Sequence, residues 1–260
     1  MSTLELIKSL KKSYETDKCL GKEQLDDFAK NAGLPSVNKF VVTKSYDRVD
    51  GQLQRLSENH GLAPGASIGV VLTGHVPLSH GAGCKSANVA WVVCLTMCSV
   101  DLGKDLYNVG TLMARQVTVP CNARGAKVRV IKCAKLCLEG PLPDGVGACE
   151  VHTLHLRWKP SGFKRSRNGL QYKDIVDFIP EQVPRDSLQS LVVSDFDLDI
   201  NAFEGLGQLP ALKSLSIYTD GVDDEGDDKS DDEDDDTDVL DMDLTENDLL
   251  EYLEIYGYRV

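Results

Sequence analysis

The start of the chain carries two short stretches of helical periodicity. Within residues 3–14, Ile7, Leu10 and Tyr14 recur at spacings of three and four, so they would share one side of a helix. Residues 22–31 hold a second apolar patch, and the glycine and proline that follow would end a helix there. We therefore expect two short helices at the N-terminus.

Residues 38–160 consist instead of short runs rich in β-branched residues, with glycine and proline between them. The runs are KFVVTKSY, ASIGVVLTGHV, NVAWVVCLTMCSV, RQVTVPC, AKVRVIKCAKLCLEG and CEVHTLHLRW. In the last run, Leu154 and Leu156 fall on one side of an extended chain and His155 and Arg157 on the other, which is typical of a half-buried strand. Six strands at this spacing predict an antiparallel sandwich or barrel.

A basic and aromatic segment follows the last predicted strand. Residues 157–173 hold six basic side chains, three aromatic rings and no acid. The basic and aromatic residues are Arg157, Trp158, Lys159, Phe163, Lys164, Arg165, Arg167, Tyr172 and Lys173. Lysine and arginine neutralise phosphates, and aromatic rings stack on unpaired bases. The segment is the strongest candidate for a functional site, as a surface for single-stranded nucleic acid; the plainer interpretation is a solvated loop.

Residues 174–218 combine a predicted short helix with a repeated leucine pattern. The helix covers 174–184 and would end at Pro180 or Pro184. In 187–218 the segments LQSLVVS and LKSLSIY repeat an L-x-x-L-x-[VI] pattern, and the interval from Leu188 to Leu212 is one found in leucine-rich repeats. Two copies alone cannot stack into a stable solenoid. A repeat and an extension of the sandwich both stay open here.

The C-terminal end of the chain is a polyanion. Residues 221–260 hold 18 acidic and 2 basic side chains, whereas residues 1–220 hold 23 acidic and 26 basic ones. The run at 219–238 repels itself, so we expect it to be disordered. Residues 245–258 are interpreted as a short helix capped by Thr245, which would either bind a protein partner or pack on the body.

Length and composition suit a protein with its own hydrophobic core. The chain has 260 residues, of which 42% are hydrophobic. It holds no apolar run long enough to cross a membrane as a helix, and its first residues mix charges with leucines, unlike a signal peptide. We expect an intracellular protein in a reducing compartment. The eight cysteines, most of them in apolar runs, are then expected to be buried free thiols.

The sequence carries none of the common catalytic or cofactor motifs. It has no phosphate loop of the G-x-x-x-x-G-K-[ST] type, no G-x-S-x-G and no H-E-x-x-H. His75, His80 and Cys84 could offer zinc ligands, with His152 and His155 from another strand, but their spacing is no established ligand pattern. We therefore predict a protein that is not an enzyme and holds no metal or cofactor.

Two central strand segments carry a family resemblance. GVVLTGHVPL ends its strand with Thr73 and Gly74, and VAWVVCLTMCSVD ends with Asp101. RQVTVP and VHTLHLRW follow, and then a glycine. In this order, over about residues 60–175, the chain resembles the 30K superfamily of plant-virus movement proteins. Asp101 would be the aspartate characteristic of that family. Tobamovirus members also carry an acidic C-terminal region.

The resemblance implies a fold, a function and a location. The fold class would be mainly β, an antiparallel jelly-roll-like β-sandwich over residues 38–160. A helical segment (1–37) would precede it, and a basic and leucine-rich extension (161–218) and the acidic tail (219–260) would follow. The function implied is viral cell-to-cell movement at plasmodesmata and in the cytoplasm. It includes sequence-independent binding of single-stranded RNA, self-association, and contacts with host plasmodesmal or endomembrane proteins.

Two other functions stay open. The acidic tail suits a chaperone for basic proteins of the nucleoplasmin-like kind, and residues 187–218 suit a leucine-rich interaction adaptor. A further possibility is that the acidic tail folds back on residues 157–173 and masks them.

Overall fold

The protein is a mixed α/β protein built on one parallel sheet. The computed structural model describes residues 1–44, 67–74, 88–95, 99–101, 109–121, 123, 127–157, 174–194, 200–218 and 250–256. Within these ranges every pair of neighbouring strands runs parallel. The predicted antiparallel jelly-roll-like sandwich is therefore wrong. Alternating apolar positions identify a strand but do not tell in which direction its neighbour runs.

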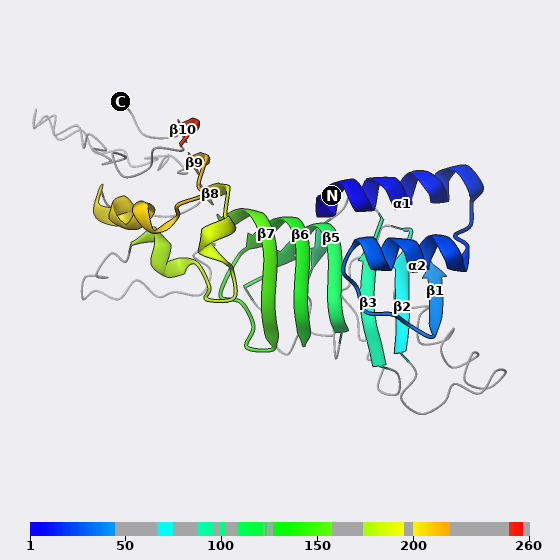
Figure 1. Cartoon of the computed structure of the whole chain (residues 1–260). Helices are drawn as coiled ribbons and strands as arrows, with labels where there is room; N and C mark the ends of the chain where they lie inside the picture. The colour runs from blue at the N-terminus through cyan, green and yellow to red at the C-terminus, as the bar shows by residue number, and fades with distance from the viewer. Residues whose placement is uncertain are drawn as a thin grey trace, which may run out of the picture.

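In the described part of the chain, nine strands lie side by side in sequence order, and Figure 1 shows them as one row. They are β1 (Lys39–Thr43), β2 (Ser67–Leu72), β3 (Asn88–Cys94), β5 (Val109–Val119), β6 (Val128–Leu138), β7 (Val146–Arg157), β8 (Ser190–Ser194), β9 (Ser214–Tyr218) and β10 (Tyr252–Tyr256). A further short strand, β4 (Ser99–Asp101), pairs with β5 off this path. A strand that contacts only its chain neighbours is the arrangement of a solenoid.

The three long central strands keep a constant register. Val109 pairs with Val128 and Val119 with Leu138, so β5 and β6 keep the same offset along their whole length. At two levels along these strands the residues that lie opposite one another are not paired, and we call them the skipped levels. The first consists of Gly110, Arg129 and Gly147, and the second of Arg115, Ala134 and His152. The first part of each long strand continues the sheet of β1–β3, and the last part continues into β8–β10.

The skipped levels change which side chains face the core. Cys133 lies in the main apolar core, whereas Cys137 lies between the core residues Leu136 and Leu138 and therefore faces the other way. Two residues four apart on a regular strand would share one face, but Cys133 and Cys137 do not, because Ala134 drops out of the alternation.

The inner face of the sheet forms the main core. Its aliphatic side chains stack from strand to strand in register, as in the column Val117, Leu136, Leu154, Leu191 and Leu215, each of which is fully buried. The described segments after β7 and β8 include the 3-10 helices η1 (Ile175–Phe178), η2 (Arg185–Ser187) and η3 (Ile200–Gln208). Of these, η1 and η3 pack on the same core. The predicted helix at 174–184 is thus the single turn η1.

Two N-terminal helices cover the outer face at one end of the row. α1 (Thr3–Asp17) and α2 (Lys22–Asn31) confirm the helices predicted there. Ser2 caps α1 and forms a capping box with Glu5. The helices bury a second apolar cluster in which Trp91 of β3 is completely buried and donates from Nε1 to the carbonyl oxygen of Pro35 at 3.1 Å. None of the helices in the described ranges is long and apolar enough to cross a membrane.

The C-terminal segment forms a strand where a helix had been expected. Residues 252–256 pair in parallel with β9, with Ile255 opposite Ile217. Ile255 packs partly against the main core. The spacing of apolar residues had suggested a helix over 245–258. The same residues also alternate as in a strand, and pairing with β9 decides in favour of the strand.

We predict that Gly110→Ala destabilises the protein. A Cβ at this position would overlap the carbonyl oxygen of Ala90 on the neighbouring strand, and a backbone atom cannot move without disturbing the β3–β5 ladder. The expected loss in the free energy of unfolding is about 1–3 kcal/mol, measured by urea denaturation. Ala148→Ser, at an exposed position of β7, is the control and should lie within about 0.5 kcal/mol of the wild type. Equal midpoints for the two variants would contradict the close approach of the two backbones.

We also predict the order in which the described cysteines react with an alkylating reagent. All six are free; Cys19 and Cys121 are exposed, and the other four are buried as expected. Burial raises the pKa of Cys94 and of Cys149 to about 12, and it raises that of Cys133 as well. Mass spectrometry of the native protein should find Cys19 and Cys121 modified first, because the thiolate is the reactive form. Equally fast modification of Cys149 without denaturant would contradict the fold.

Candidate functional site

The predicted nucleic-acid surface lies almost wholly outside the described residues. Arg157, at the end of β7, lies 3.9 Å from the carboxylate of Glu139. The remaining residues of that surface are not described by the structure: Trp158, Lys159, Phe163, Lys164, Arg165, Arg167, Tyr172 and Lys173. Asp101 lies on β4, where its backbone pairs with Thr118. The nucleic-acid surface stays a prediction.

The candidate metal ligands are not gathered in the described part of the chain. His75, His80 and Cys84 fall outside it. His152 is exposed at the second skipped level, and His155 lies on β7 with Nε2 2.9 Å from Oγ of Ser194. Among the described residues, no group of three histidine, cysteine or acidic side chains could hold a metal ion.

The outer face of the sheet changes character along the row of strands. Beneath α1 and α2 it is apolar, because β2, β3 and β5 turn Val71, Trp91, Val93 and Met113 toward the helices. Lys132 of β6, which is paired in the ladder with Met113, is the first charge at this level. Its ammonium group lies 3.0 Å from Glu150 of β7 and 3.4 Å from the carbonyl oxygen of Ala32, just after α2. Among the described residues, the apolar cluster beneath α1 and α2 holds no side chain from the strands after β5.

The outer side chains of β7–β10 form a regular surface, which we call the ladder face. Three columns run across it in register: Thr153, Ser190, Ser214 and Tyr252; His155, Val192, Ser216 and Glu254; Arg157, Ser194, Tyr218 and Tyr256. Four of the six positions on β8 and β9 are serines, and each column ends at β10 in a larger side chain. Leu191, Val193, Leu215 and Ile217 lie between these positions and face the core. Ile255 packs partly against the same core, which fixes the direction of the side chains on the ladder face.

Three tyrosines stand at the β10 end of the ladder face, and we call them with Glu254 the tyrosine cluster. Tyr218, Tyr252 and Tyr256 are 37%, 51% and 57% exposed. The rings of Tyr218 and Tyr256 stack with centroids 5.5 Å apart and planes at 9°. Oη of Tyr218 donates to Oε2 of Glu254 at 2.9 Å, and Oγ of Ser216 donates to the same oxygen at 3.4 Å.

Hydrogen bonds fix the protonation states within the tyrosine cluster. The bond from Tyr218, followed by those from Tyr252 and Tyr256, lowers the pKa of Glu254. The carboxylate raises in turn the pKa of Tyr218 and of Tyr252 through the same bonds. At neutral pH, Glu254 is therefore an anionic carboxylate beside the neutral, electron-rich rings of Tyr218 and Tyr252.

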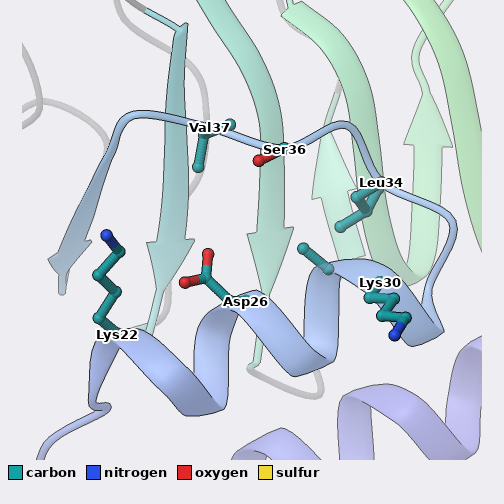
Figure 2. A pocket seen from close by; sticks show the side chains of 7 residues that line it. Lys22, Asp26, Lys30, Leu34, Ser36 and Val37 are labelled. Carbon is teal, nitrogen blue, oxygen red and sulfur yellow. The ribbon is translucent and has the colours of Figure 1, made fainter.

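A separate hollow lies between α2 and the segment that returns from it to β1 (Figure 2). Its volume is about 400 Å³, and its lining residues are Lys22, Asp26, Ala29, Lys30, Leu34, Ser36 and Val37. Lys22 and Asp26 point toward the segment that carries Ser36, whereas the amino group of Lys30 points away from it (Figure 2). One cation and one anion facing a shallow hollow do not select a ligand charge, so we place the candidate site on the ladder face.

Comparisons of the chain with protein-family models, with curated proteins and with solved structures give no match.

The sequence pattern contained a signal for the ladder face that the helical interpretation overlooked. The two copies of the leucine pattern pair as β8 and β9, with Leu191 opposite Leu215, so the positions between their apolar residues form the ladder face. Tyr252, Glu254 and Tyr256 alternate in the same way, but the spacing of the leucines beside them had favoured a helix. The alternation of Tyr252, Glu254 and Tyr256 matches the alternation in the two copies of the leucine pattern, and this match would have identified β10 as a strand.

Proposed function

We propose that this protein is a non-catalytic protein-binding module whose ladder face contacts the partner. The observation that supports this function best is the arrangement of three exposed tyrosines on a parallel sheet whose neighbouring strands carry serines, of which Ser190 and Ser214 are half-buried and Ser194 and Ser216 buried. Tyrosine supplies a large contact area with few rotatable bonds, and serine supplies hydrogen bonds that adapt to the partner. Tyrosine is also enriched among the residues that dominate binding energy.

The solenoid arrangement supports the same function. Strands stacked in chain order present an extended surface, and repeat proteins of this kind use such surfaces to bind other proteins. This brings forward the leucine-rich interaction adaptor, one of the functions that the sequence left open. The parallel sheet differs from the jelly-roll sandwich that the movement-protein resemblance implied, so the fold lends that function no support.

The proposal predicts that bulky charges on the ladder face block binding. Ser190 and Ser214 lie side by side in its first column, so Ser190→Arg with Ser214→Arg should weaken the partner's binding about tenfold or more. The matched control is Ser9→Arg on the exposed side of α1, which should leave affinity within about twofold. A photo-crosslinking residue at position 190, with one at position 9 as reference, identifies the partner. Calorimetry with the purified partner then measures each variant.

Two results would contradict the proposed function. One is unchanged affinity for the variant at positions 190 and 214 with strong loss for the control at position 9, which would move the interface to the helices. The other is a set of identical adducts from positions 190 and 9. Thermal denaturation of each variant separates lost binding from lost folding.

Binding of single-stranded RNA remains a separate prediction from the sequence, and it can be tested independently. Replacing Lys164, Arg165 and Arg167 with alanine would remove about three phosphate contacts. The slope of log K against log salt should then flatten by roughly two units. Filter retention of labelled RNA at several salt concentrations measures this slope. An unchanged slope and affinity would remove the basic segment from consideration as a nucleic-acid site.

A further inference from the structure

The end of the ladder face has the chemistry of a site for a cation. β10 places Tyr252, Glu254 and Tyr256 on one face, and Tyr218 of β9 stacks on the ring of Tyr256. Rings of this kind attract an ammonium or guanidinium group over their faces, and a carboxylate beside them adds a charged hydrogen-bond acceptor.

The described cations near this cluster have other partners. Nζ of Lys213 lies 3.1 Å from Oε1 of Glu251, at the start of β10. Arg157, in the same column as Tyr218 and Tyr256, pairs with Glu139. In the described part of the chain, Glu254 forms hydrogen bonds to hydroxyl groups and no ion pair. Among the described residues, its negative charge thus stands at the surface without a cation to balance it.

The sequence around the cluster favours a basic ligand. The segment 219–249 joins β9 to β10 and carries 17 acidic side chains and one lysine. Both of its ends are fixed next to the cluster, since Tyr218 precedes it and Leu250 follows it. A polyanion attached at these two points gives the region a strongly negative potential, which attracts cationic partners and speeds their association.

We propose that the tyrosine cluster binds an arginine or lysine side chain from a basic segment of the partner protein. The proposal deepens the proposed function, because it names the chemistry that the ladder face recognises. The cation lies over the exposed rings of Tyr252 and Tyr256 with Glu254 as its acceptor. The half-buried Ser190 and Ser214 contact the residues that flank it, and the charge of the acidic segment supplies long-range attraction.

The test uses the full-length protein and a pair of synthetic peptides. One is a short peptide with a single central arginine among serines and glycines, and the other replaces that arginine with neutral citrulline. Nuclear magnetic resonance titration follows the ring signals of the tyrosines and gives the dissociation constant. We expect the arginine peptide to shift the signals of Tyr252 and Tyr256, and the citrulline peptide to bind about fivefold more weakly or not at all.

Matched variants separate the cluster from the charge around it. Glu254→Gln and Glu251→Gln each remove one carboxylate from the same part of the chain, but only Glu254 lies in the cluster. We expect Glu254→Gln to weaken arginine-peptide binding about two- to fivefold, and Glu251→Gln to leave it nearly unchanged. Tyr256→Leu should cost a similar factor, whereas Tyr256→Phe keeps the ring and should stay within about twofold. These positions are at the surface, and thermal denaturation checks that each variant is folded.

Each of the following outcomes would overturn the inference, and each would identify a different cause. Equal losses for Glu254→Gln and Glu251→Gln would mean that the acidic segment attracts the peptide non-specifically. If the chain's own basic segment occupies the cluster, alanine at Lys164, Arg165 and Arg167 would strengthen peptide binding. A dimer that dissociates on Glu254→Gln in sedimentation would make a second copy the occupant. If cluster-dependent binding fails while Ser190→Arg with Ser214→Arg still blocks the partner, the cation site falls and the proposed function stands.

Discussion

The register of the parallel strands is the constraint on which the rest of the structure depends. Each inward leucine or valine of β5–β9 stacks on the equivalent residue of the next strand, so the core is a set of continuous aliphatic columns. A shift by one residue on any strand would turn its whole apolar set outward and its serines or lysines inward. Because burying an apolar side chain is worth about 1.5–3 kcal/mol, several such losses together would exceed the stability of an ordinary domain, about 5–15 kcal/mol. The same register aligns the side chains of the ladder face.

The composition of the outer face decides where the helices end and where the site begins. The apolar cluster beneath α1 and α2 extends from Phe40 and Val42 of β1 to Met113 of β5. At β6 the equivalent position is Lys132, paired with Glu150 and bound to a carbonyl group just after α2, so covering it further would bury a charge pair. From β7 onward the outer positions are small, polar or aromatic, which suits a surface that meets a partner.

The positions of the helices and strands could be predicted from the sequence better than the way in which neighbouring strands pair. All six predicted strand runs contain a strand, and both predicted N-terminal helices are present, because period-2 and period-3.6 patterns are local properties of the chain. Strand direction is set by the connections, and long connections such as those around β3 allow either direction. The nearly constant spacing of β5, β6 and β7 and the two leucine copies were evidence for parallel stacking, but neither was decisive alone. The tyrosine cluster was hidden because LLEYLEIY satisfies helical and extended spacing at once. Only the strand beside it decides between the two.

The position of the acidic segment shows how a repeat can carry a charged insertion at small cost. The connection from Tyr218 to Tyr252 is longer than the one from Ser194 to Ser214, but it is less than twice as long. Loop-closure entropy grows with the logarithm of length, so this difference costs only about 0.5 kcal/mol. The contact of Ile255 with the core next to Ile217 is sufficient to offset that amount. β10 can therefore complete the ladder face even though a polyanion interrupts the chain before it. The pairing of β10 with β9 holds both ends of the insertion beside the exposed tyrosines, so its negative charge lies next to them along the chain.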